Sequence, residues 1–270
     1  MIVVTGSYGY IGKHITARLL KQSQQVRTLT GHPNRTNPFG SAVEALPFSF
    51  DNPEKLAKSL KGASVLFNTY WVRFEYGGAT FQQAVQNSAT LFECARKAGV
   101  AKIVHISVSN ASADSTLPYF AGKSRVEDAL KRVGVSYSII RPTLVFGHED
   151  VLVNNIAWLM RWFPVFPIFG SGKYKIQPVH VEDVAAIAVA SADDPNSLAI
   201  DAAGPEVFSY KDFIRLIAAQ VKPSTLLIHL PPFLGVALGR LIGLALRDVV
   251  LTRTELKGLT QLPLHEVWIC

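Results

Sequence analysis

Charged residues are scarce in this chain. Asp, Glu, Lys and Arg make up only 17% of its 270 residues, whereas hydrophobic residues make up 49%. Disordered proteins have the opposite balance, so this composition favours a folded protein with a large core. Cysteine is almost absent, and two cysteines, Cys94 and Cys270, cannot form the disulfide framework of a small secreted domain. Their positions show no metal-ligand spacing either, so we expect a protein of a reducing compartment without a metal site.

The chain also lacks long basic runs and an uninterrupted apolar span, and we expect no leader. Its net charge is +7, but the lysines and arginines are scattered, so we expect no nucleic-acid partner. The apolar residues 1–4 lead directly into a glycine-rich turn with no basic region before them, which favours a cytoplasmic location. Residues 226–246 are apolar but contain a proline pair and Arg240, which argue against a membrane span. We expect residues 233–246 to form a buried or partner-facing helix instead.

Apolar strands alternate with amphipathic helices over the first two-thirds of the chain. This order is typical of a doubly wound parallel sheet. Strands are expected at residues 2–5, 25–29, 45–50, 65–68, 102–107 and 136–141, and helices at residues 10–22, 53–60, 80–98, 119–132, 180–192 and 209–220. After Phe146 the sequence becomes rich in proline and aromatic residues. We therefore predict an α/β protein with a Rossmann core at residues 1–145, to which residues 179–192 return, and a smaller interleaved cap at residues 146–178 and 193–270.

The segment TGSYGYIG, residues 5–12, follows the first expected strand and opens the first expected helix. Three glycines at this spacing allow a sharp turn, a close approach of the backbone to a pyrophosphate and tight packing of the helix on the sheet. The helix N-terminus then offers unpaired N–H groups to the phosphates. A merely structural turn is the alternative. We expect a dinucleotide to bind here, in contact with Gly6, Tyr8, Gly9, Tyr10, Ile11 and Gly12.

A carboxylate is missing after the second expected strand, where an Asp or Glu would bind the ribose 2′-hydroxyl of NAD. The chain reads LTGHPNR at residues 29–35. Arg35, together with Thr30 and His32, can instead hold a 2′-phosphate through charge-assisted hydrogen bonds. NADP(H) is therefore the favoured cofactor. NAD(H) is the alternative, with Arg35 then an ordinary solvated loop residue.

Tyr119 and Lys123 stand four residues apart in an expected helix, so both side chains project from one face. An ammonium beside a phenol lowers the phenol pKa toward working pH, which suits the tyrosine to proton transfer with a substrate oxygen. A serine hydroxyl close by would orient that oxygen. Ser109 and Ser107 both qualify by spacing, and a Tyr-x-x-x-Lys pair taken alone is common by chance.

The glycine turn and the Tyr119–Lys123 pair together resemble the short-chain dehydrogenase/reductase superfamily, and in detail its extended and atypical branches. The first turn of those branches reads Thr-Gly-x-x-Gly-x-x-Gly, as it does here. Further landmarks recur in order at residues 91–100 (LFECARKAGV), 141–147 (RPTLVFG) and 178–185 (PVHVEDVA). The resemblance covers roughly residues 1–215. Within the superfamily the chain is similar to atypical members related to the accessory NAD(P)-binding subunit of respiratory complex I, and to NAD-dependent epimerase/dehydratase-like proteins.

This resemblance implies roles for individual residues. Tyr119 would be the catalytic acid or base, Lys123 would bind both the ribose and the tyrosine, and Ser109 would orient the substrate. Pro142 and Thr143 would lie beside the nicotinamide.

The chain departs from the superfamily at three places. An Asp-hydrophobic pair that contacts the adenine in many relatives is replaced by Ser49-Phe50, so we expect adenine contact there to rest on the backbone. Small residues after the fourth strand are replaced by the segment Asn68-Thr69-Tyr70-Trp71, in which Asn68 is still expected at the cofactor while the aromatics narrow or close the mouth of the site. The family's helix asparagine is displaced, since Asn87 lies about one turn later. This leaves the family's proton relay unsupported.

We therefore expect an NADP(H)-dependent oxidoreductase that transfers a hydride to or from an apolar carbonyl or alcohol. A redox-silent NAD(P)H-binding structural, assembly or sensor protein is the alternative, and a nucleotide-sugar epimerase or dehydratase is the third option. A small apolar substrate is the expected partner. Contact with a membrane surface or a protein complex through residues 233–246 is left open, as is a homodimer through the helices at residues 80–98 and 119–132.

Overall fold

Two compact units make up the chain. The computed structural model describes residues 1–72, 75 and 77–231. Among the described residues, the first unit comprises Met1–Pro142 and His180–Ala202, and the second comprises Thr143–Val179 together with residues 203–231. The chain thus enters the second unit, returns to the first, and enters the second again.

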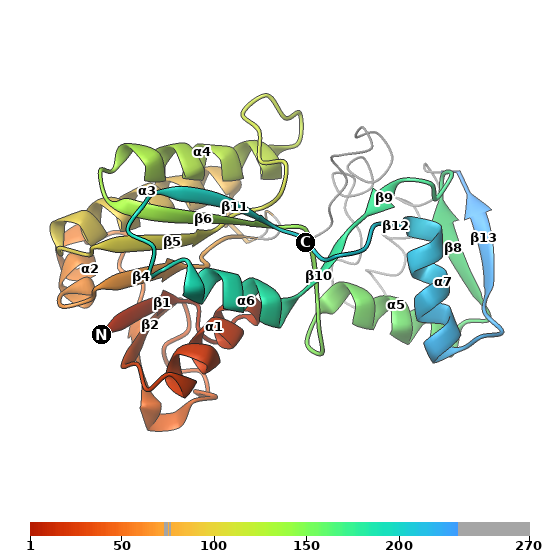
Figure 1. Ribbon diagram of the computed structural model, residues 1–270, viewed down its shortest axis with the longest axis horizontal. Helices are drawn as coiled ribbons and strands as arrows, with labels where there is room; N and C mark the ends of the chain where they lie inside the picture. Colours follow the sequence, from red (N-terminus) through yellow and green to blue (C-terminus); the bar gives the residue numbers. More distant parts are fainter. Residues whose placement is uncertain (73–74, 76, 232–270) are drawn as a thin grey trace. The chain divides into compact units, whose positions relative to one another are not determined.

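A seven-stranded sheet forms the centre of the first unit (Figure 1). Its strand order is β11-β6-β5-β4-β1-β2-β3, and every pairing is parallel. The strands are β1 (Ile2–Thr5), β2 (Val26–Thr30), β3 (Val43–Pro47), β4 (Val65–Asn68), β5 (Lys102–Ile106), β6 (Ser136–Pro142) and β11 (Leu198–Ala202). This arrangement is a doubly wound Rossmann fold, and it confirms the fold class expected from the sequence.

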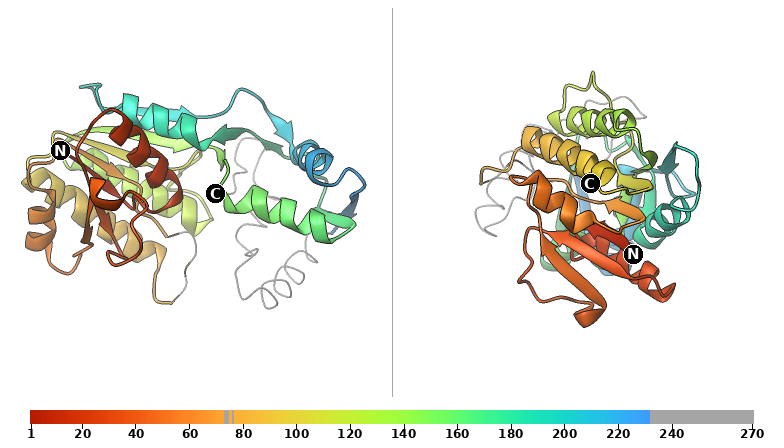
Figure 2. Two further views of the ribbon diagram at one scale, coloured as in Figure 1. Left: turned by 90° about the horizontal axis from the view of Figure 1, so that it is seen from below. Right: turned by 90° about the vertical axis from the view of Figure 1, so that its left-hand side faces the viewer.

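Helices cover both faces of this sheet (Figure 2). On one face α1 (Tyr10–Lys21) packs against α6 (Val181–Ala190). On the other face α3 (Phe81–Lys97) packs between α2 (Pro53–Leu60) and α4 (Pro118–Arg132). Leucine, valine and phenylalanine side chains of α2, α3 and α4 form a buried core with β1, β4 and β5. Because both faces are covered, the central strands β1, β4 and β5 are buried along almost their whole length rather than at alternate residues.

Strand β1 lies at the point where the strand order reverses. The chain runs outward from β1 through β2 to the edge strand β3, and then returns to β4 on the other side of β1. A short 3₁₀ helix, η1 (Gly40–Ala42), directly precedes β3. In sheets of this kind, ligands bind outside the carboxyl ends of the strands at such a reversal. The turn after β1 and the segment after β4 are therefore the places where a site is expected.

In the second unit a helix is followed by a strand at two places in the chain. α5 (Val151–Trp162) precedes β8 (Val165–Phe169), α7 (Tyr210–Val221) precedes β13 (Leu226–Leu230), and the two strands pair in parallel. Apolar side chains of both helices and of β8 form a second core. The shorter strands are β7 (Leu144–Phe146), β9 (Lys175–Ile176), β10 (Pro178–His180) and β12 (Phe208–Ser209).

Two sequence predictions concern the later part of the chain. Residues 146–178 hold more regular structure than expected, because α5 and β8 lie where proline and aromatic residues obscured the pattern. Residues 233–246, expected to form a helix, lie outside the residues that the structure describes. Across residues 1–72, 75 and 77–231, no helix has both the length and the hydropathy needed to cross a membrane.

Candidate functional site

The turn after β1 is built from glycine. The Gly6 N–H donates to the Leu29 carbonyl of β2 (2.8 Å), and the Gly9 N–H donates back to the Gly6 carbonyl (2.8 Å). Gly6 has a φ of +67°, which residues with a side chain rarely adopt. A Cβ at Gly12 would collide with the Gly6 carbonyl oxygen. The first turn of α1 can therefore pack on the glycine turn only while position 12 has no side chain.

Helix α1 begins at Tyr10 without a side-chain cap. Its N-cap residue is Gly9, which has no side-chain atom to accept from the first N–H groups of the helix. Those N–H groups and the positive end of the helix dipole suit a phosphate. Tyr8, Tyr10 and Ile11 are half-buried around the turn, and the buried Tyr8 hydroxyl has no hydrogen-bond partner among the described residues. An acceptor on a bound nucleotide would satisfy that hydroxyl.

The loop after β2 carries the residues expected to select the dinucleotide. Thr30 is buried, and its hydroxyl accepts from the N–H of His32 (3.2 Å). His32 and Arg35 are exposed, and no carboxylate of the described residues pairs with Arg35. Arg27, near the start of β2, is instead paired with Glu44 of β3 (2.7 Å). The Arg35 guanidinium is therefore available to a phosphate, and its role stays a prediction.

Aromatic rings gather after β3. Phe50 stacks on Phe48 with ring centroids 4.8 Å apart, and Tyr70 meets these rings at 5.0 and 5.1 Å. Ser49, between the two phenylalanines in sequence, is buried. Asn87 of α3 donates to the Tyr70 hydroxyl (2.8 Å), so its amide supports this ring. Sequence reasoning named Ser49, Phe50 and Tyr70 but missed Phe48, although an aromatic residue directly after a strand end is a signal that could have found it.

A buried hydrogen-bond chain connects the ends of β1, β4 and β5. The Thr5 hydroxyl accepts from the N–H groups of Thr69 (2.8 Å) and Tyr70 (3.0 Å), so its own proton points to Oδ1 of Asn68 (3.0 Å). The Nδ2 group of Asn68 therefore faces Nδ1 of His105 at 3.1 Å. Since an amide nitrogen only donates, Nδ1 of His105 accepts and the ring proton lies on Nε2. Both ends of the Asn68 side chain are thus engaged within the protein.

His105 is completely buried, and its pKa is held well below the usual value for histidine. Burial is the main cause, and the positive charge of Lys123 lowers the pKa further. The imidazole is therefore neutral at physiological pH. Sequence reasoning missed both Thr5 and His105, although a histidine inside an otherwise apolar central strand is unusual enough to mark the position.

The two candidate serines have different surroundings. The Ser107 hydroxyl donates to Oε1 of Glu127 (2.6 Å), and Arg141 donates to both oxygens of the same carboxylate (3.0 and 2.6 Å). Ser107 therefore belongs to a buried ion-pair network that joins α4 to β6. Ser109 is also buried, but its hydroxyl donates only to a backbone carbonyl, that of Arg141 (3.0 Å). The network leaves Ser109 as the better candidate for contact with a substrate.

The two residues expected beside the nicotinamide lie at a boundary between the units. Pro142 is the last residue of this part of the first unit, and its carbonyl accepts from the Ser109 N–H (3.0 Å). Thr143 is the first residue of the second unit, where its hydroxyl donates to the Gln177 carbonyl. Pro142 thus has a fixed place near the end of β5, whereas the expected contacts of both residues with the nicotinamide stay predictions.

Tyr119 and Lys123 lie in α4 beside a cluster of aromatic rings. Lys123 is 4% exposed, and its ammonium donates to the Ile106 carbonyl at the end of β5 (2.9 Å). The same ammonium lies 4.8 Å from the ring centre of Trp71. The Tyr119 ring meets Trp71 and Phe81 edge to face, each at 5.9 Å. The aromatic segment after β4, expected to narrow or close the site, therefore lies directly on the tyrosine–lysine pair.

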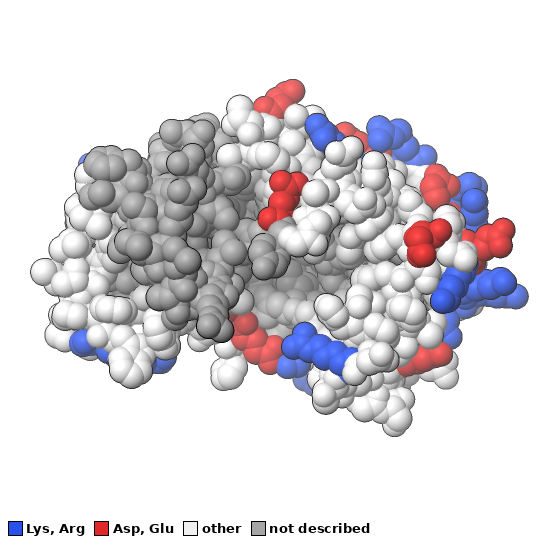
Figure 3. Space-filling view, turned by 180° about the vertical axis from the view of Figure 1, so that it is seen from behind, with Lys and Arg blue, Asp and Glu red and all other residues white. Residues whose placement is uncertain are grey.

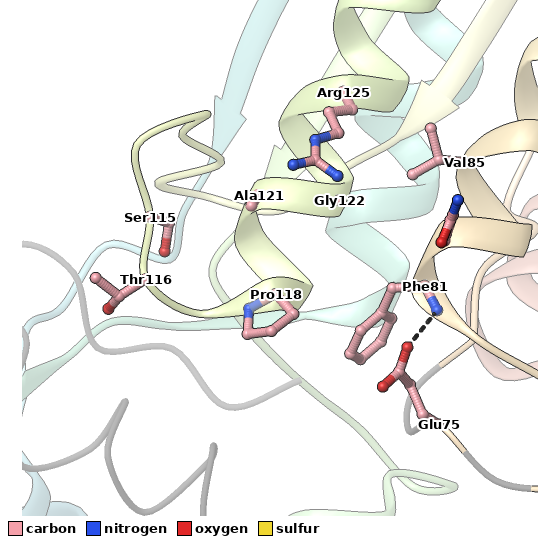
Figure 4. A pocket seen from close by; sticks show the side chains of 10 residues that line it. Glu75, Phe81, Val85, Ser115, Thr116, Pro118, Ala121, Gly122 and Arg125 are labelled. Carbon is pink, nitrogen blue, oxygen red and sulfur yellow. Dashed lines mark hydrogen bonds between the residues drawn. The ribbon is translucent and has the colours of Figure 1, made fainter.

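A cavity of about 320 Å³ opens between the first turns of α3 and α4 (Figure 4). It is lined by Glu75, Phe81, Gln82, Val85, Ser115, Thr116, Pro118, Ala121, Gly122 and Arg125. Figure 4 shows Glu75 at its rim, accepting from the Phe81 N–H (2.9 Å). Tyr119 and Lys123 are not part of the lining, because their side chains leave α4 on a different face. This cavity is therefore separate from the predicted catalytic pair.

Basic and acidic side chains are interspersed on the face shown in Figure 3. Exposed pairs of opposite charge occur among the described residues, such as Arg96 with Glu93 and Arg215 with Asp212, both at 3.0 Å. Exposed pairs of this kind add little to stability. On this face neither sign of charge is gathered in one patch.

Residues 6–195 match the model of a protein family described as NAD(P)H-binding. The chain belongs to this family. The match extends from the glycine turn through α4 to α6, and it confirms the expected nicotinamide cofactor in its general form, NAD(P).

Curated relatives cover most of this NAD(P)H-binding protein. One is "NADH dehydrogenase [ubiquinone] 1 alpha subcomplex subunit 9, mitochondrial" from Arabidopsis thaliana, 25% identical over 239 residues, which are 84% of this chain and 60% of the relative. Another is "Ceramide reductase" from Caulobacter vibrioides, 27% identical over 197 residues, which are 72% of this chain and 62% of the relative. The chain thus spans about three-fifths of the length of these relatives.

Solved structures with the same fold bind nucleotide sugars. MoeE5 in complex with UDP-glucose and NAD superposes with a TM-score of 0.71 at 20% identity, covering 85% of each chain. UDP-glucose 4-epimerase from Thermotoga maritima gives a TM-score of 0.68 at 18% identity, covering 85% of each chain. At these identities the likeness concerns the fold alone. Together with the family match and the curated relatives, it confirms the resemblance to extended and atypical short-chain dehydrogenase/reductases.

The expectation about partners is corrected by these relatives. The sequence pointed first to a small apolar molecule and left contact with a protein complex open only through residues 233–246. Several matched relatives are subunits by name, including the Arabidopsis thaliana and Rattus norvegicus proteins. Giving protein complexes only this secondary place was therefore wrong. The sequence could not rank the two kinds of partner, because an apolar and aromatic composition is typical of substrate pockets and of protein interfaces alike.

Proposed function

We propose that this protein is an NADP(H)-dependent oxidoreductase that transfers a hydride to or from an apolar carbonyl or alcohol. The observation that carries the proposal is the placement of Tyr119 and Lys123 on one face of α4, with Lys123 buried against the end of β5. That strand end lies at the carboxyl edge of the sheet, next to β4, where nucleotides bind in this fold. A proton donor at this edge can serve a carbonyl that accepts a hydride.

The chemistry divides between the cofactor and the chain. When bound, the nicotinamide supplies or takes the hydride. The Tyr119 hydroxyl gives a proton to the carbonyl oxygen, or takes one in the reverse direction. The Lys123 ammonium stabilises the phenolate that remains, because opposite charges attract across the short distance between neighbouring turns of a helix. Ser109 turns its hydroxyl from the Arg141 carbonyl, 3.0 Å away, to the substrate oxygen and orients it.

Two observations support an apolar acceptor. Large apolar side chains of the second unit are exposed, with Trp158 at 39%, Trp162 at 69% and Phe163 at 52%. The relative from Caulobacter vibrioides is named for the reduction of ceramide, a lipid. An acceptor with a long apolar part would bury such side chains and remove their apolar surface from water.

The preference for NADP(H) rests on the loop after β2. Arg35 and His32 are exposed there, and residues 29–35 contain no carboxylate that would repel a 2′-phosphate. An arginine can hold a phosphate through two parallel hydrogen bonds, which a neutral ribose hydroxyl does not offer. The loop therefore favours the phosphorylated dinucleotide.

The substitution Tyr119→Phe tests the proposed reaction. Removing the hydroxyl removes the proton donor, so kcat for NADPH oxidation with a panel of carbonyls and quinones should fall about 10²–10⁴-fold. The affinity for NADPH, measured by calorimetry, should stay unchanged. Tyr137→Phe, a half-buried tyrosine of β6 away from the pair, is the matched control and should retain full activity. Turnover that survives Tyr119→Phe would show that the tyrosine is not the proton donor.

A redox-silent NAD(P)H-binding subunit or sensor is the second candidate function. Two observations favour it: the Trp71 ring lies over the Lys123 ammonium, and several relatives carry the names of respiratory-chain subunits. This candidate predicts tight NADPH binding by calorimetry with no oxidation by any acceptor of the same panel. It also predicts that Tyr119→Phe changes nothing, which separates it from the oxidoreductase.

A further inference from the structure

The Trp71 indole lies over the Lys123 ammonium. The indole lies 4.8 Å from the Lys123 ammonium, and Lys123 is 4% exposed. On its other side the indole stacks on Phe81 with ring centroids 5.9 Å apart. The ammonium donates to the Ile106 carbonyl (2.9 Å), so in this arrangement it is held by the protein itself.

Gly122 makes room for this arrangement. A Cβ at position 122 would lie 2.9 Å from Cη2 of Trp71 and 3.3 Å from its Cζ2. Real Cβ atoms do not approach ring carbons that closely, so any side chain at position 122 would push the indole away. Glycine is otherwise a poor choice here, because it lies inside α4 and lowers the stability of the helix relative to alanine. The glycine therefore has a packing function, which is to admit the indole.

The indole is well packed but poorly hydrogen-bonded. Its Nε1–H is buried and has no acceptor among the described residues. A buried donor without a partner destabilises the position that buries it, because its hydrogen bond to water is lost and not replaced. When Trp71 covers Lys123, its ring contacts stabilise this position but its unsatisfied N–H destabilises it. The free-energy difference between the covering position and one in which the indole has moved away is therefore small.

We propose that Trp71 determines access to Lys123: the indole covers the ammonium, and the ribose hydroxyls of a nicotinamide cofactor reach it only when the indole leaves Gly122. This inference rests on the proposed cofactor site and adds a specific control element to it. Trp71 acts through Lys123 and is a positioning residue, since it holds no reacting atom. The cover also accounts for both candidate functions, because a cover that opens readily gives an oxidoreductase and one that stays closed gives a redox-silent protein.

The cover can be tested without any cofactor. Acetic anhydride acetylates accessible lysines, and peptide mass spectrometry follows each lysine separately. Lys102 is also 4% exposed, but it donates to the carbonyls of Asp194 and Asn196 at the far end of β5, so it serves as an internal reference of equal burial. In Trp71→Ala the acetylation rate of Lys123 should rise about tenfold while that of Lys102 stays the same. Equal rates at Lys123 in wild type and variant would overturn the cover.

Gly122→Ala provides a second, independent variant. It keeps the indole but displaces it, and it strengthens α4, so a loss of folding is not expected. It should raise Lys123 acetylation in the same direction as Trp71→Ala. Ser124→Ala, which also strengthens α4 but does not touch Trp71, is the matched control and should leave the rate unchanged. Protection of Lys123 in Gly122→Ala equal to that in wild type would contradict the packing argument.

Cofactor association gives the functional readout. NADPH fluorescence rises on binding, and stopped flow with the full chain follows this rise. The association rate should be about tenfold higher in Trp71→Ala and Gly122→Ala than in wild type. The reason is that binding is slowed in proportion when the state that can bind is rarely populated. Ser124→Ala, the same matched control, should match wild type. If both variants bind NADPH but associate with it at the wild-type rate, the proposed role of Trp71 is wrong and the proposed function still stands. Absence of NADPH binding by calorimetry in wild type and all variants would instead overturn the proposed function.

Discussion

A single arginine decides the expected cofactor preference. Arg27 lies near the start of β2 and Arg35 lies in the loop after it, and the two guanidinium groups differ in their hydrogen-bond partners. Arg27 is paired with Glu44 (2.7 Å) and also donates to the Ser59 carbonyl (2.9 Å), so its hydrogen bonds hold β2 to its neighbours. Arg35 is exposed in a loop without such a partner among the described residues. The same residue type is therefore structural at one position and available for binding at the other.

Arg35→Gln should lower NADPH affinity and leave NADH affinity unchanged. A hydrogen bond to a charged group contributes about 1.5–3 kcal/mol, so the dissociation constant for NADPH should rise roughly 10- to 100-fold. Arg132→Gln, at the exposed end of α4, removes the same charge from a distant position and is the control. Calorimetric titration with both dinucleotides measures the effect. Equal weakening for NADPH and NADH would mean that Arg35 does not read the 2′-phosphate.

Individual elements depend on caps that sequence periodicity does not reveal. Helix α5 is apolar on both faces: Ile156 and Met160 are buried, whereas Trp158 and Trp162 are exposed. Large apolar side chains on the exposed face, within a stretch rich in proline and aromatic residues, are the reason why the sequence analysis did not predict this helix. Its start is nevertheless well defined, because the Asp150 carboxylate accepts from the N–H groups at positions 152 and 153 (2.9 and 2.7 Å).

Asp150→Ala should destabilise α5 and with it the second unit. Loss of an N-cap side chain leaves two N–H groups unsatisfied and costs about 1 kcal/mol. Asp150→Asn keeps an oxygen for capping and should lose much less. Urea denaturation followed by tryptophan fluorescence reports the change, because Trp158 and Trp162 lie in this helix. Equal stability of the alanine and asparagine variants would show that the cap does not hold the helix.

The whole first unit has a buried titratable centre in His105. The ring lies where β1, β4 and β5 end, in hydrogen-bond contact with Asn68 (3.1 Å) and edge to face with Phe92 of α3 (5.9 Å). Its pKa in the folded protein is far below the unfolded value, chiefly because burial disfavours the charged form. Protonation of this ring is therefore coupled to unfolding.

The free energy of unfolding should fall as the pH drops below about 6.5. In this range the unfolded chain takes up a proton at His105 and the folded protein does not, so the unfolded state is favoured by up to about 1.4 kcal/mol for each pH unit. The stability is present above the unfolded pKa and is lost on acidification. Urea denaturation between about pH 7 and pH 5 measures the slope. His105→Gln should flatten it, and an unchanged slope in that variant would exclude His105 as the source.

Much of the fold follows from local properties of the sequence. Strand periods, helix periods and the steric freedom of glycine act over a few residues, so the parallel sheet and the turn at Gly6, Gly9 and Gly12 could be read directly. The edge strand β11 was not predicted, because its residues are only partly buried and it depends on pairing with β6, some sixty positions earlier. Local pattern thus predicts elements that are stable in themselves and misses those that a neighbour completes.

The sequence by itself determined the fold class, the NAD(P)-binding character and the residue types that could perform hydride chemistry. Only the tertiary structure decided how these residues are used. It ties Thr5 to Asn68 across 63 positions and Asn68 to His105 across 37, commits Ser107 to Glu127, and lays Trp71 on Lys123. The physical reason is that hydrogen bonds and ring contacts depend on distances in space, and residues far apart in the chain acquire those distances only when the sheet has formed.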